Sequence, residues 1–202
     1  MKLTAQRLLF VTTVLPFIAQ AAAVQPNLIG EWPTYGNGPA HTGYFPGTLN
    51  NLPFVQKWKT PVPSSTISQP AVAGGRVFVA AGYYYSAMTL RALDANTGAG
   101  LWTNSFTPAA SLNPPTYDSG AVFIQRANNS TDSQIFSFNA TNGASRWTNS
   151  FQSQSSKYFA PIVANGAVYA DTGYYGGLTC YNQTNGALKF FTQIYGNGCW
   201  ES

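Results

Sequence analysis

The most conspicuous shortage in this 202-residue chain is charge. Asp, Glu, Lys and Arg make up 8% of the sequence, against about a quarter in an average soluble domain. The formal net charge is +4, and the basic residues are scattered, with no run that could follow a phosphate backbone, so we expect no binding to nucleic acid. Neutral polar residues and tyrosine replace the charges, which suits an exported, β-rich protein.

Cysteine and histidine are nearly absent as well. Two cysteines, Cys180 and Cys199, and one histidine, His41, leave no metal-ligand cluster in the sequence. His41 has no carboxylate or cysteine near it, which makes it a poor candidate for acid–base catalysis. In an exported chain, Cys180 and Cys199 can form a disulfide that closes a loop of about 20 residues and contributes roughly 3 kcal/mol. The alternative, two unpaired small residues in the core, fits the sequence equally well.

Long hydrophobic runs are missing except at the N-terminus. Lys2 and Arg7 precede the apolar run "LLFVTTVLPFIAQA", and small residues follow it. This pattern predicts a cleaved secretory signal peptide over residues 1–23 and a secreted or periplasmic protein. A membrane anchor is the alternative, but the run is short and is interrupted by threonines and Pro16. No cysteine at the cleavage site offers a lipid attachment point, and we expect no membrane span in the rest of the chain.

The feature present in abundance is a threefold repeat. The stretches "ALDANTGAGLW", "SFNATNGASRW" and "CYNQTNGALKF" begin at Ala92, Ser137 and Cys180. Their Asp or Asn positions are 45 and 43 residues apart, and an upstream block, "GGRVFVA", "SGAVFIQ" and "NGAVYAD", recurs at nearly the same spacing. Agreement between independent markers at one period indicates a true structural repeat. The corresponding motif residues are Asp94, Asn139 and Asn182; Gly98, Gly143 and Gly186; and Trp102, Trp147 and Phe190.

Each unit of the repeat has the pattern of four short strands. In the first unit the segments "QPAVA", "RVFVAA", "TLRALDA" and "GLWTNSF" are rich in β-branched and aromatic residues and are separated by turn residues. Four strands per unit of about 45 residues predict an all-β fold of antiparallel β-propeller blades. A plain β-sandwich is the alternative. We expect the Asp or Asn and Gly to form a tight turn, and the aromatic residue to pack between neighbouring blades.

These motifs resemble the pyrroloquinoline-quinone (PQQ) repeat, whose motif is Ala-x-Asp-x-x-x-Gly-x-x-x-Trp. The first copy matches at Ala92, Asp94, Gly98 and Trp102, although Ala99-Gly100 replaces the usual Lys-Glu. The second and third copies depart further, since Asn replaces Asp in both and Phe190 replaces Trp in the third. The resemblance, over about residues 69–200, implies a propeller fold but is weak for any activity.

The resemblance extends to the residues before the first unit. "EWPTYGNGPAHTGYFPG" is similar to the lead-in of this superfamily, and "FVQKWKTPV" resembles an outer strand with Trp58 in the place of Trp102. We therefore divide the chain into a signal peptide (1–23), a lead-in with an outer strand (24–68) and repeat blades (69–202). Three blades plus one strand cannot close a ring of the usual size, so we expect a fragment of a longer propeller or, alternatively, a ring assembled from several copies.

The resemblance implies two functions from different classes. The superfamily contains non-catalytic members, including an outer-membrane assembly factor, and quinoprotein dehydrogenases that oxidise alcohols or sugars with bound PQQ and calcium. The dehydrogenases use an adjacent pair of cysteines and calcium-binding carboxylates. This chain has no adjacent Cys pair, and of its few acids only Asp171 stands at an expected strand end beside glycines and tyrosines.

We therefore predict no catalytic residue and no cofactor in this chain. The first hypothesis is a non-catalytic module that binds a protein or polymer ligand through loops such as those at Tyr83–Tyr85 and Tyr174–Tyr175. The alternative is the N-terminal portion of a PQQ-dependent dehydrogenase with its active site in other blades. Self-association through open blade edges is a further expectation.

Overall fold

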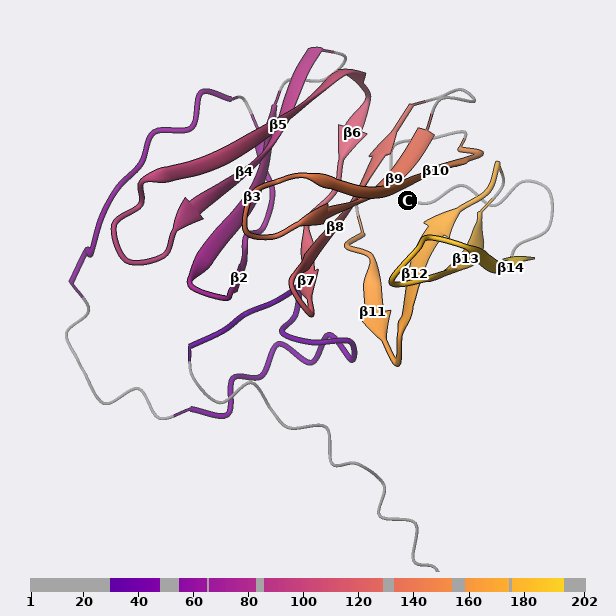
Figure 1. Ribbon diagram of the computed structural model, residues 1–202, viewed down its shortest axis with the longest axis horizontal. Coiled ribbons are helices and arrows are strands. Elements are labelled where there is room, and N and C mark those ends of the chain that lie inside the picture. The colour runs from indigo at the N-terminus through magenta and orange to yellow at the C-terminus, as the bar shows by residue number, and fades with distance from the viewer. Residues whose placement is uncertain are drawn as a thin grey trace, which may run out of the picture.

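The repeat units fold as three antiparallel sheets that follow one another along the chain (Figure 1). The computed structural model describes residues 30–47, 55–64, 66–82, 86–128, 133–153, 159–174 and 176–194. These residues contain fourteen strands and no helix, so the all-β prediction is confirmed. Within these ranges there is accordingly no helix long and apolar enough to cross a membrane.

The first sheet contains the four predicted strands and one short addition. Its strand order is β1-β3-β4-β5, and β2 pairs with the same strand, β3, as β1 does. The inner edge position is thus shared by two short strands, since β1 meets the far end of β3 and β2 the near end. The bounds are β1 Thr66–Ile67, β2 Ala71–Ala73, β3 Arg76–Gly82, β4 Ser86–Asp94 and β5 Gly100–Ala109.

The second and third sheets repeat this plan. In the second, β6 and β7 share the inner edge of β8, followed by β9 and β10; the third has the simple order β11-β12-β13-β14. The second sheet comprises β6 Ser111–Leu112, β7 Thr116–Asp118, β8 Ala121–Ala127, β9 Ser133–Asn139 and β10 Ser145–Phe151. The third comprises β11 Ile162–Ala164, β12 Ala167–Thr172, β13 Gly177–Asn182 and β14 Leu188–Gln193.

The middle sheet is covered on both faces, which explains the continuous apolar run of β8. Successive side chains of a strand point to opposite faces. Val122 and Ile124 accordingly join a cluster with the first sheet, whereas Ala121 and Phe123 join a cluster with the third. A strand buried on both faces loses the polar alternation that a half-exposed strand would show.

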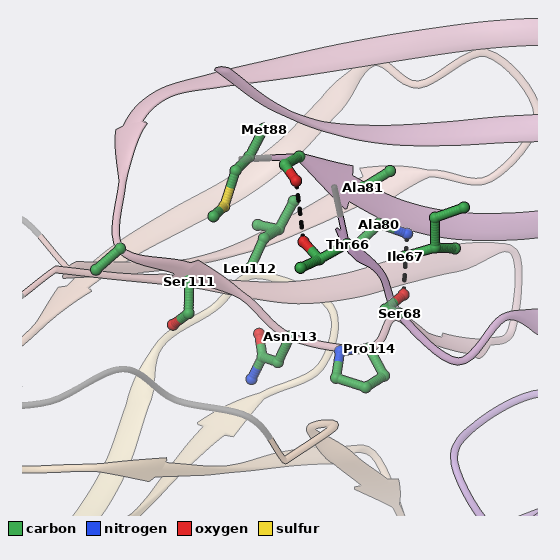
Figure 2. Close-up of a pocket in the computed structure, with 12 residues that line it drawn as sticks. Thr66, Ile67, Ser68, Ala80, Ala81, Met88, Ser111, Leu112, Asn113 and Pro114 are labelled. Atoms are coloured by element: carbon green, nitrogen blue, oxygen red, sulfur yellow. Dashed lines mark hydrogen bonds between the residues drawn. The ribbon is translucent and has the colours of Figure 1, made fainter. Parts of the chain in front are cut away.

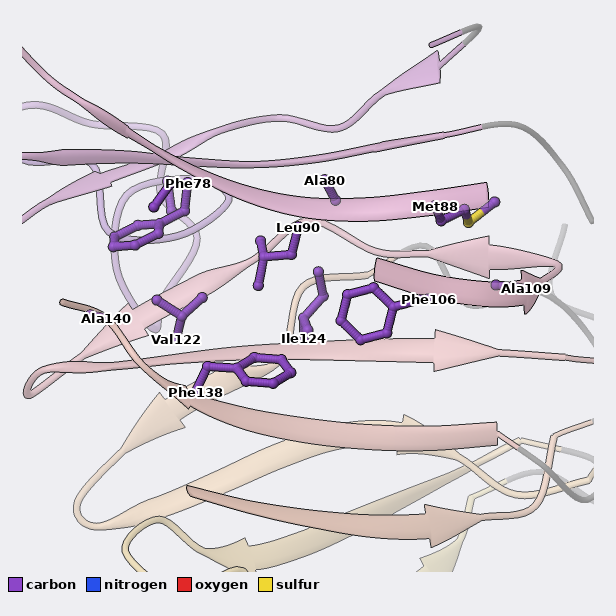
Figure 3. Packing of buried hydrophobic residues seen from close by; sticks show 12 residues of the cluster. Phe78, Ala80, Met88, Leu90, Phe106, Ala109, Val122, Ile124, Phe138 and Ala140 are labelled. Carbon is purple, nitrogen blue, oxygen red and sulfur yellow. The ribbon is translucent and has the colours of Figure 1, made fainter. Parts of the chain in front are cut away.

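The hydrophobic core lies between sheets rather than within one. Figure 3 shows Phe78, Leu90 and Phe106 of the first sheet facing Val122 and Phe138 of the second. The second cluster joins Phe123, Ile135, Trp147 and Phe151 to Val163, Val168 and Tyr181 of the third sheet. A single sheet of this kind has no core of its own, so the stability of each blade depends on its neighbours.

The lead-in lies along the inner edge of the first two sheets. Trp32 forms an isolated antiparallel bridge with Val72 of β2, with both N···O distances at 2.7 Å. The backbone N–H of Tyr117 in β7 donates to the Pro33 carbonyl oxygen at 2.8 Å, and the Thr34 and Thr116 hydroxyls are hydrogen-bonded. The chain before the first blade is therefore part of the packed structure.

Residues 55–64 differ from the outer strand that the sequence predicted. The segment docks against the first sheet through Trp58 and Thr60 but belongs to none of the three described sheets. Its side chains make the contacts of an outer strand, while its backbone lacks a described neighbouring strand with which to form a ladder.

Candidate functional site

The predicted Asp/Asn–Gly turns are present in all three repeats. The Asp94 carboxylate accepts hydrogen bonds from the backbone N–H groups of Asn96 and Thr97, both at 2.9 Å, and from the Thr97 hydroxyl at 3.0 Å. These bonds, the Thr97 backbone bond foremost, lower the pKa of Asp94 below its usual value. The side-chain carbonyl oxygens of Asn139 and Asn182 accept the corresponding backbone bonds. These residues build hairpins, as the sequence predicted.

Three tryptophans each dock on the glycine of the turn that follows along the chain. The indole N–H groups of Trp58, Trp102 and Trp147 donate to the backbone carbonyls of Ala95, Ala140 and Gln183 at 2.9–3.0 Å. The glycines of these three turns, Gly98, Gly143 and Gly186, have the same left-handed φ of 73°. A Cβ on any of them would lie within 2.9 Å of the docked indole ring. Glycine is required here both for its φ and for the close approach of the ring.

A second contact at each junction was not anticipated from the sequence. Thr60, Asn104 and Asn149, each two residues after the tryptophan, donate from their side chains to the carbonyls of Gly98, Gly143 and Gly186. The donor–acceptor distances are 2.7, 2.9 and 2.7 Å. The signal was present in the alignment of the repeats, since a polar donor recurs at this position.

Burial of the aromatic residues differs among the repeats. Trp147 is 8% exposed and has Tyr181 of the third sheet beside it, with ring centroids 6.1 Å apart. Trp102, which was expected to be buried, is only half-buried. Phe190, the corresponding residue of β14, is 43% exposed, because no described sheet follows the third one.

The one described cysteine is buried. Cys180 lies in β13 at 1% exposure, opposite Phe190. Cys199 is outside the described residues, so the disulfide and the unpaired alternative both stay open. The predicted signal peptide (1–23), Tyr83–Tyr85 and Tyr175 also lie outside the described residues.

A pocket of about 370 Å³ opens between the first and second sheets (Figure 2). Ala80, Ala81, Met88, Ala110 and Leu112 provide apolar walls. The polar side chains among the described lining residues are hydroxyls and an amide, and none of these described residues is ionisable. The remaining lining residues are Thr66, Ile67, Ser68, Gly82, Ser111, Asn113 and Pro114.

The hydroxyl groups of the pocket are held by backbone groups. The Thr66 hydroxyl donates to the Gly82 carbonyl at 2.9 Å. The Ser68 hydroxyl donates to the Gln69 carbonyl and accepts from the Ala80 N–H, both at 3.1 Å. The polar rim is therefore fixed in place, as a preformed binding site requires.

The described carboxylates are dispersed and serve the fold. Glu31 accepts a hydrogen bond from the Gly74 N–H at 2.9 Å, and Asp118 accepts one from the Gln183 side chain. Asp171, expected at a strand end, is the penultimate residue of β12 and lies opposite Leu178. His41 packs edge-to-face on Tyr35, with ring centroids 5.5 Å apart. Among the described residues no three His, Cys, Asp or Glu side chains come together as a metal site.

Comparison with models of known protein families gives one match. The family model described as "Outer membrane protein assembly factor BamB", built on the PQQ-like repeat, matches residues 55–187, well over half of the chain. The chain belongs to this family. No curated protein matches it.

Solved structures with the same fold include both classes of protein. The chain is similar to BamB from Moraxella catarrhalis, with 22% identity and a TM-score of 0.55, over 68% of this chain and 43% of that one. It is also similar to quinohemoprotein alcohol dehydrogenase from Comamonas testosteroni, with 22% identity and a TM-score of 0.62, over 84% of this chain and 28% of that one. A europium-containing methanol dehydrogenase aligns with a TM-score of 0.54 at 18% identity, over 80% of this chain and 31% of that one. This PQQ-like propeller chain thus spans less than half the length of each of these structures.

Proposed function

We propose that this chain acts as a non-catalytic binding or scaffold module of an exported PQQ-like propeller. The observation that carries the proposal is the use of its carboxylates. Glu31, Asp94 and Asp118 accept structural hydrogen bonds from the chain itself, and they lie on different elements. An active site needs titratable groups that converge on one reacting atom, and the described residues offer no such convergence.

The candidate ligand surface is neutral. The pocket between the first two sheets combines apolar walls with fixed hydroxyls and an amide, which suits an uncharged part of a protein or polymer. The name of the matched family, an assembly factor, supports a scaffold role. The basic residues remain scattered in the sequence, so nucleic acid is not among the proposed partners. Secretion to the periplasm or beyond is proposed from residues 1–23 of the sequence.

The second candidate is the N-terminal portion of a PQQ-dependent alcohol or sugar dehydrogenase. The similarity to quinohemoprotein alcohol dehydrogenase, at a TM-score of 0.62, favours it. The residues present do not fit the groups that such an enzyme holds, because the described carboxylates do not cluster and the sequence has no adjacent cysteine pair. Under this candidate the binding residues for PQQ and calcium belong to other blades.

Dye-linked oxidation tests the non-catalytic proposal for this chain. The purified chain is incubated with PQQ and calcium, and reduction of an artificial electron acceptor is followed with ethanol or glucose as substrate. We expect the rate to equal that of a sample without protein. Substrate-dependent turnover by this chain would refute the non-catalytic proposal.

A further inference from the structure

The pocket between the first and second sheets has a counterpart between the second and third sheets, and the counterpart is filled. Alignment of the repeats on Gly75, Gly120 and Gly166 places Ala80 of the first unit at the position of Gln125 in the second. The prolines Pro70 and Pro115 likewise place Ser68 at the position of Asn113. Two small side chains in the first junction thus correspond to two carboxamides in the second.

The two carboxamides of the second junction form one buried network. Gln125 and Asn113 are each 1% exposed. The Asn113 amide donates to the Gln125 side-chain oxygen at 2.9 Å and to the Phe159 carbonyl at 2.5 Å. The Gln125 amide donates to the Asp171 carbonyl at 2.7 Å. Carboxamides therefore bridge the second sheet to a backbone carbonyl of β12 and to one in the segment before β11.

The first junction has one matching carbonyl that lacks the bridging donor. By the same alignment, the backbone carbonyl of Asn113 corresponds to that of Phe159. It accepts no hydrogen bond from the described residues, and Asn113 lines the pocket. Ala80 has no polar side-chain atom, and the Ser68 hydroxyl is already used within its own unit.

The other residues that line the pocket determine which chemical group can supply the hydrogen-bond donor. Met88, Leu112 and Ala81 surround the same space, and Met88 is 6% exposed. A charged group would lose its hydration there without an opposite charge among the described lining residues. An uncharged amide on an apolar stem keeps the apolar contacts and supplies the missing donor.

We infer that this pocket binds a primary carboxamide carried on an apolar stem, as a glutamine side chain or a free aliphatic amide provides. The second junction of the same chain displays the contacts that such a group makes. The inference rests on the proposed binding function and names the ligand chemistry for it.

The test uses butyramide and its charged analogue butyrate as probes for the whole chain. Two-dimensional amide NMR spectra are recorded during titration. We expect butyramide to bind with a dissociation constant on the order of millimolar, as a ligand of few atoms allows. The shifted resonances should be those of residues 80–82 and 110–113. Butyrate should bind at least about tenfold more weakly, because the pocket cannot solvate its charge. A capped glutamine, N-acetyl-glutamine methylamide, tests a peptide source: tighter binding than butyramide assigns the site to a protein ligand, and weaker binding to a free amide.

The matched variants are Ala80→Gln combined with Ser68→Asn, which rebuild the filled junction, and Ala99→Gln on the exposed side of a hairpin. We expect the double variant to lose the butyramide shifts while Ala99→Gln retains them. Shifts elsewhere in the protein, equal binding of butyrate, or no binding of either amide to the wild-type chain would overturn the inference. The dye-linked assay reads the proposed function separately, so the two can fail independently.

Discussion

At the residue scale, the same amino acid can be required for different physical reasons at different positions, as two glycines show. Gly143 and Gly120 both have left-handed backbones, with φ of 73° and 76°. Only Gly143 is also contacted by a neighbouring sheet, because its missing Cβ leaves room for the Trp102 ring at 2.9 Å. Around Gly120 nothing lies within 4 Å of that position. Comparing substitutions at Gly143 and Gly120 therefore separates the cost of a left-handed backbone from the cost of disturbing the packing between blades.

Gly143→Ala should therefore destabilise the chain more than Gly120→Ala. Both variants incur about 1–2 kcal/mol for a left-handed alanine. Gly143→Ala adds about 1–3 kcal/mol because the new methyl group displaces the indole. Urea denaturation of both variants measures the difference. Equal losses of unfolding free energy would mean that the docking contact contributes nothing.

Two buried serines provide a second contrast. Ser137 and Ser133 are both 0% exposed. The Ser133 hydroxyl accepts from the Asn128 N–H and donates to the Asn128 carbonyl. The Ser137 hydroxyl has no partner among the described residues, and the first repeat has Ala92 at this position. An unpaired buried hydroxyl costs free energy, whereas a paired one stabilises.

Ser137→Ala should raise the free energy of unfolding by about 1 kcal/mol, and Ser133→Ala should lower it by about 1–3 kcal/mol because it leaves the Asn128 groups unpaired. Thermal and chemical denaturation give the two signs. A loss of stability in Ser137→Ala would indicate a partner for that hydroxyl in the folded protein.

At the scale of the element, the hairpins show what the sequence could predict. The strands and turns follow from local residues: alternation, β-branched side chains, and an Asp or Asn four residues before a glycine. These features recur three times, so errors in one copy are corrected by the others. The prediction was incomplete for residues 55–64, because pairing of that segment depends on an inner strand and not on its own composition.

The pocket could not be predicted for the same reason. It exists because Ser68 and Ala80 face the second sheet where a carboxamide pair faces the third. Small residues in a strand say nothing about a cavity until the opposite surface is known. The donors that follow each tryptophan were predictable in principle, since Thr60, Asn104 and Asn149 occupy one position of the repeat.

The hairpin at Asp94 should also respond to acid in a way that the other two do not. Its backbone hydrogen bonds favour the carboxylate and lower its pKa in the folded state. A lowered pKa stabilises the fold above the unfolded-state pKa of about 3.9, and this contribution is lost as the pH falls through the folded-state value. Asn139 and Asn182 make the same turns without titrating.

Asp94→Asn should therefore fold normally near pH 7 and lose less stability than the wild type between about pH 5 and pH 2. Urea denaturation across this range is the measurement, and Asp118→Asn serves as a second acid variant for comparison. An unchanged pH dependence in Asp94→Asn would show that the turn does not depend on the carboxylate form.

At the scale of the whole molecule, each sheet is stabilised by the sheet or sheets packed against it. The middle sheet has a hydrophobic cluster on each face. The strand β14 has the same two kinds of docking residue, an aromatic residue and a polar residue two positions later. Here both are exposed: Phe190 at 43%, and Thr192. Leu188 at its start and Ile194 directly after its end are 64% and 55% exposed. An apolar strand of this kind is a template for association when little charge opposes it.

We expect the purified chain to self-associate through this face. Phe190→Asp should shift the sedimentation profile toward monomer, because it places a charge where an apolar contact forms. Tyr44→Asp is the matched control, since Tyr44 is an aromatic residue of the lead-in at 68% exposure and the change in charge is identical.

Sedimentation velocity at two salt concentrations separates apolar from electrostatic association, since salt screens only the latter. A compact wild-type monomer, or equal dispersal by Tyr44→Asp, would show that the β14 face is not the site of contact. Neither outcome would affect the docking of Trp58, Trp102 and Trp147. Each of these indoles donates a hydrogen bond to a backbone carbonyl of the same chain.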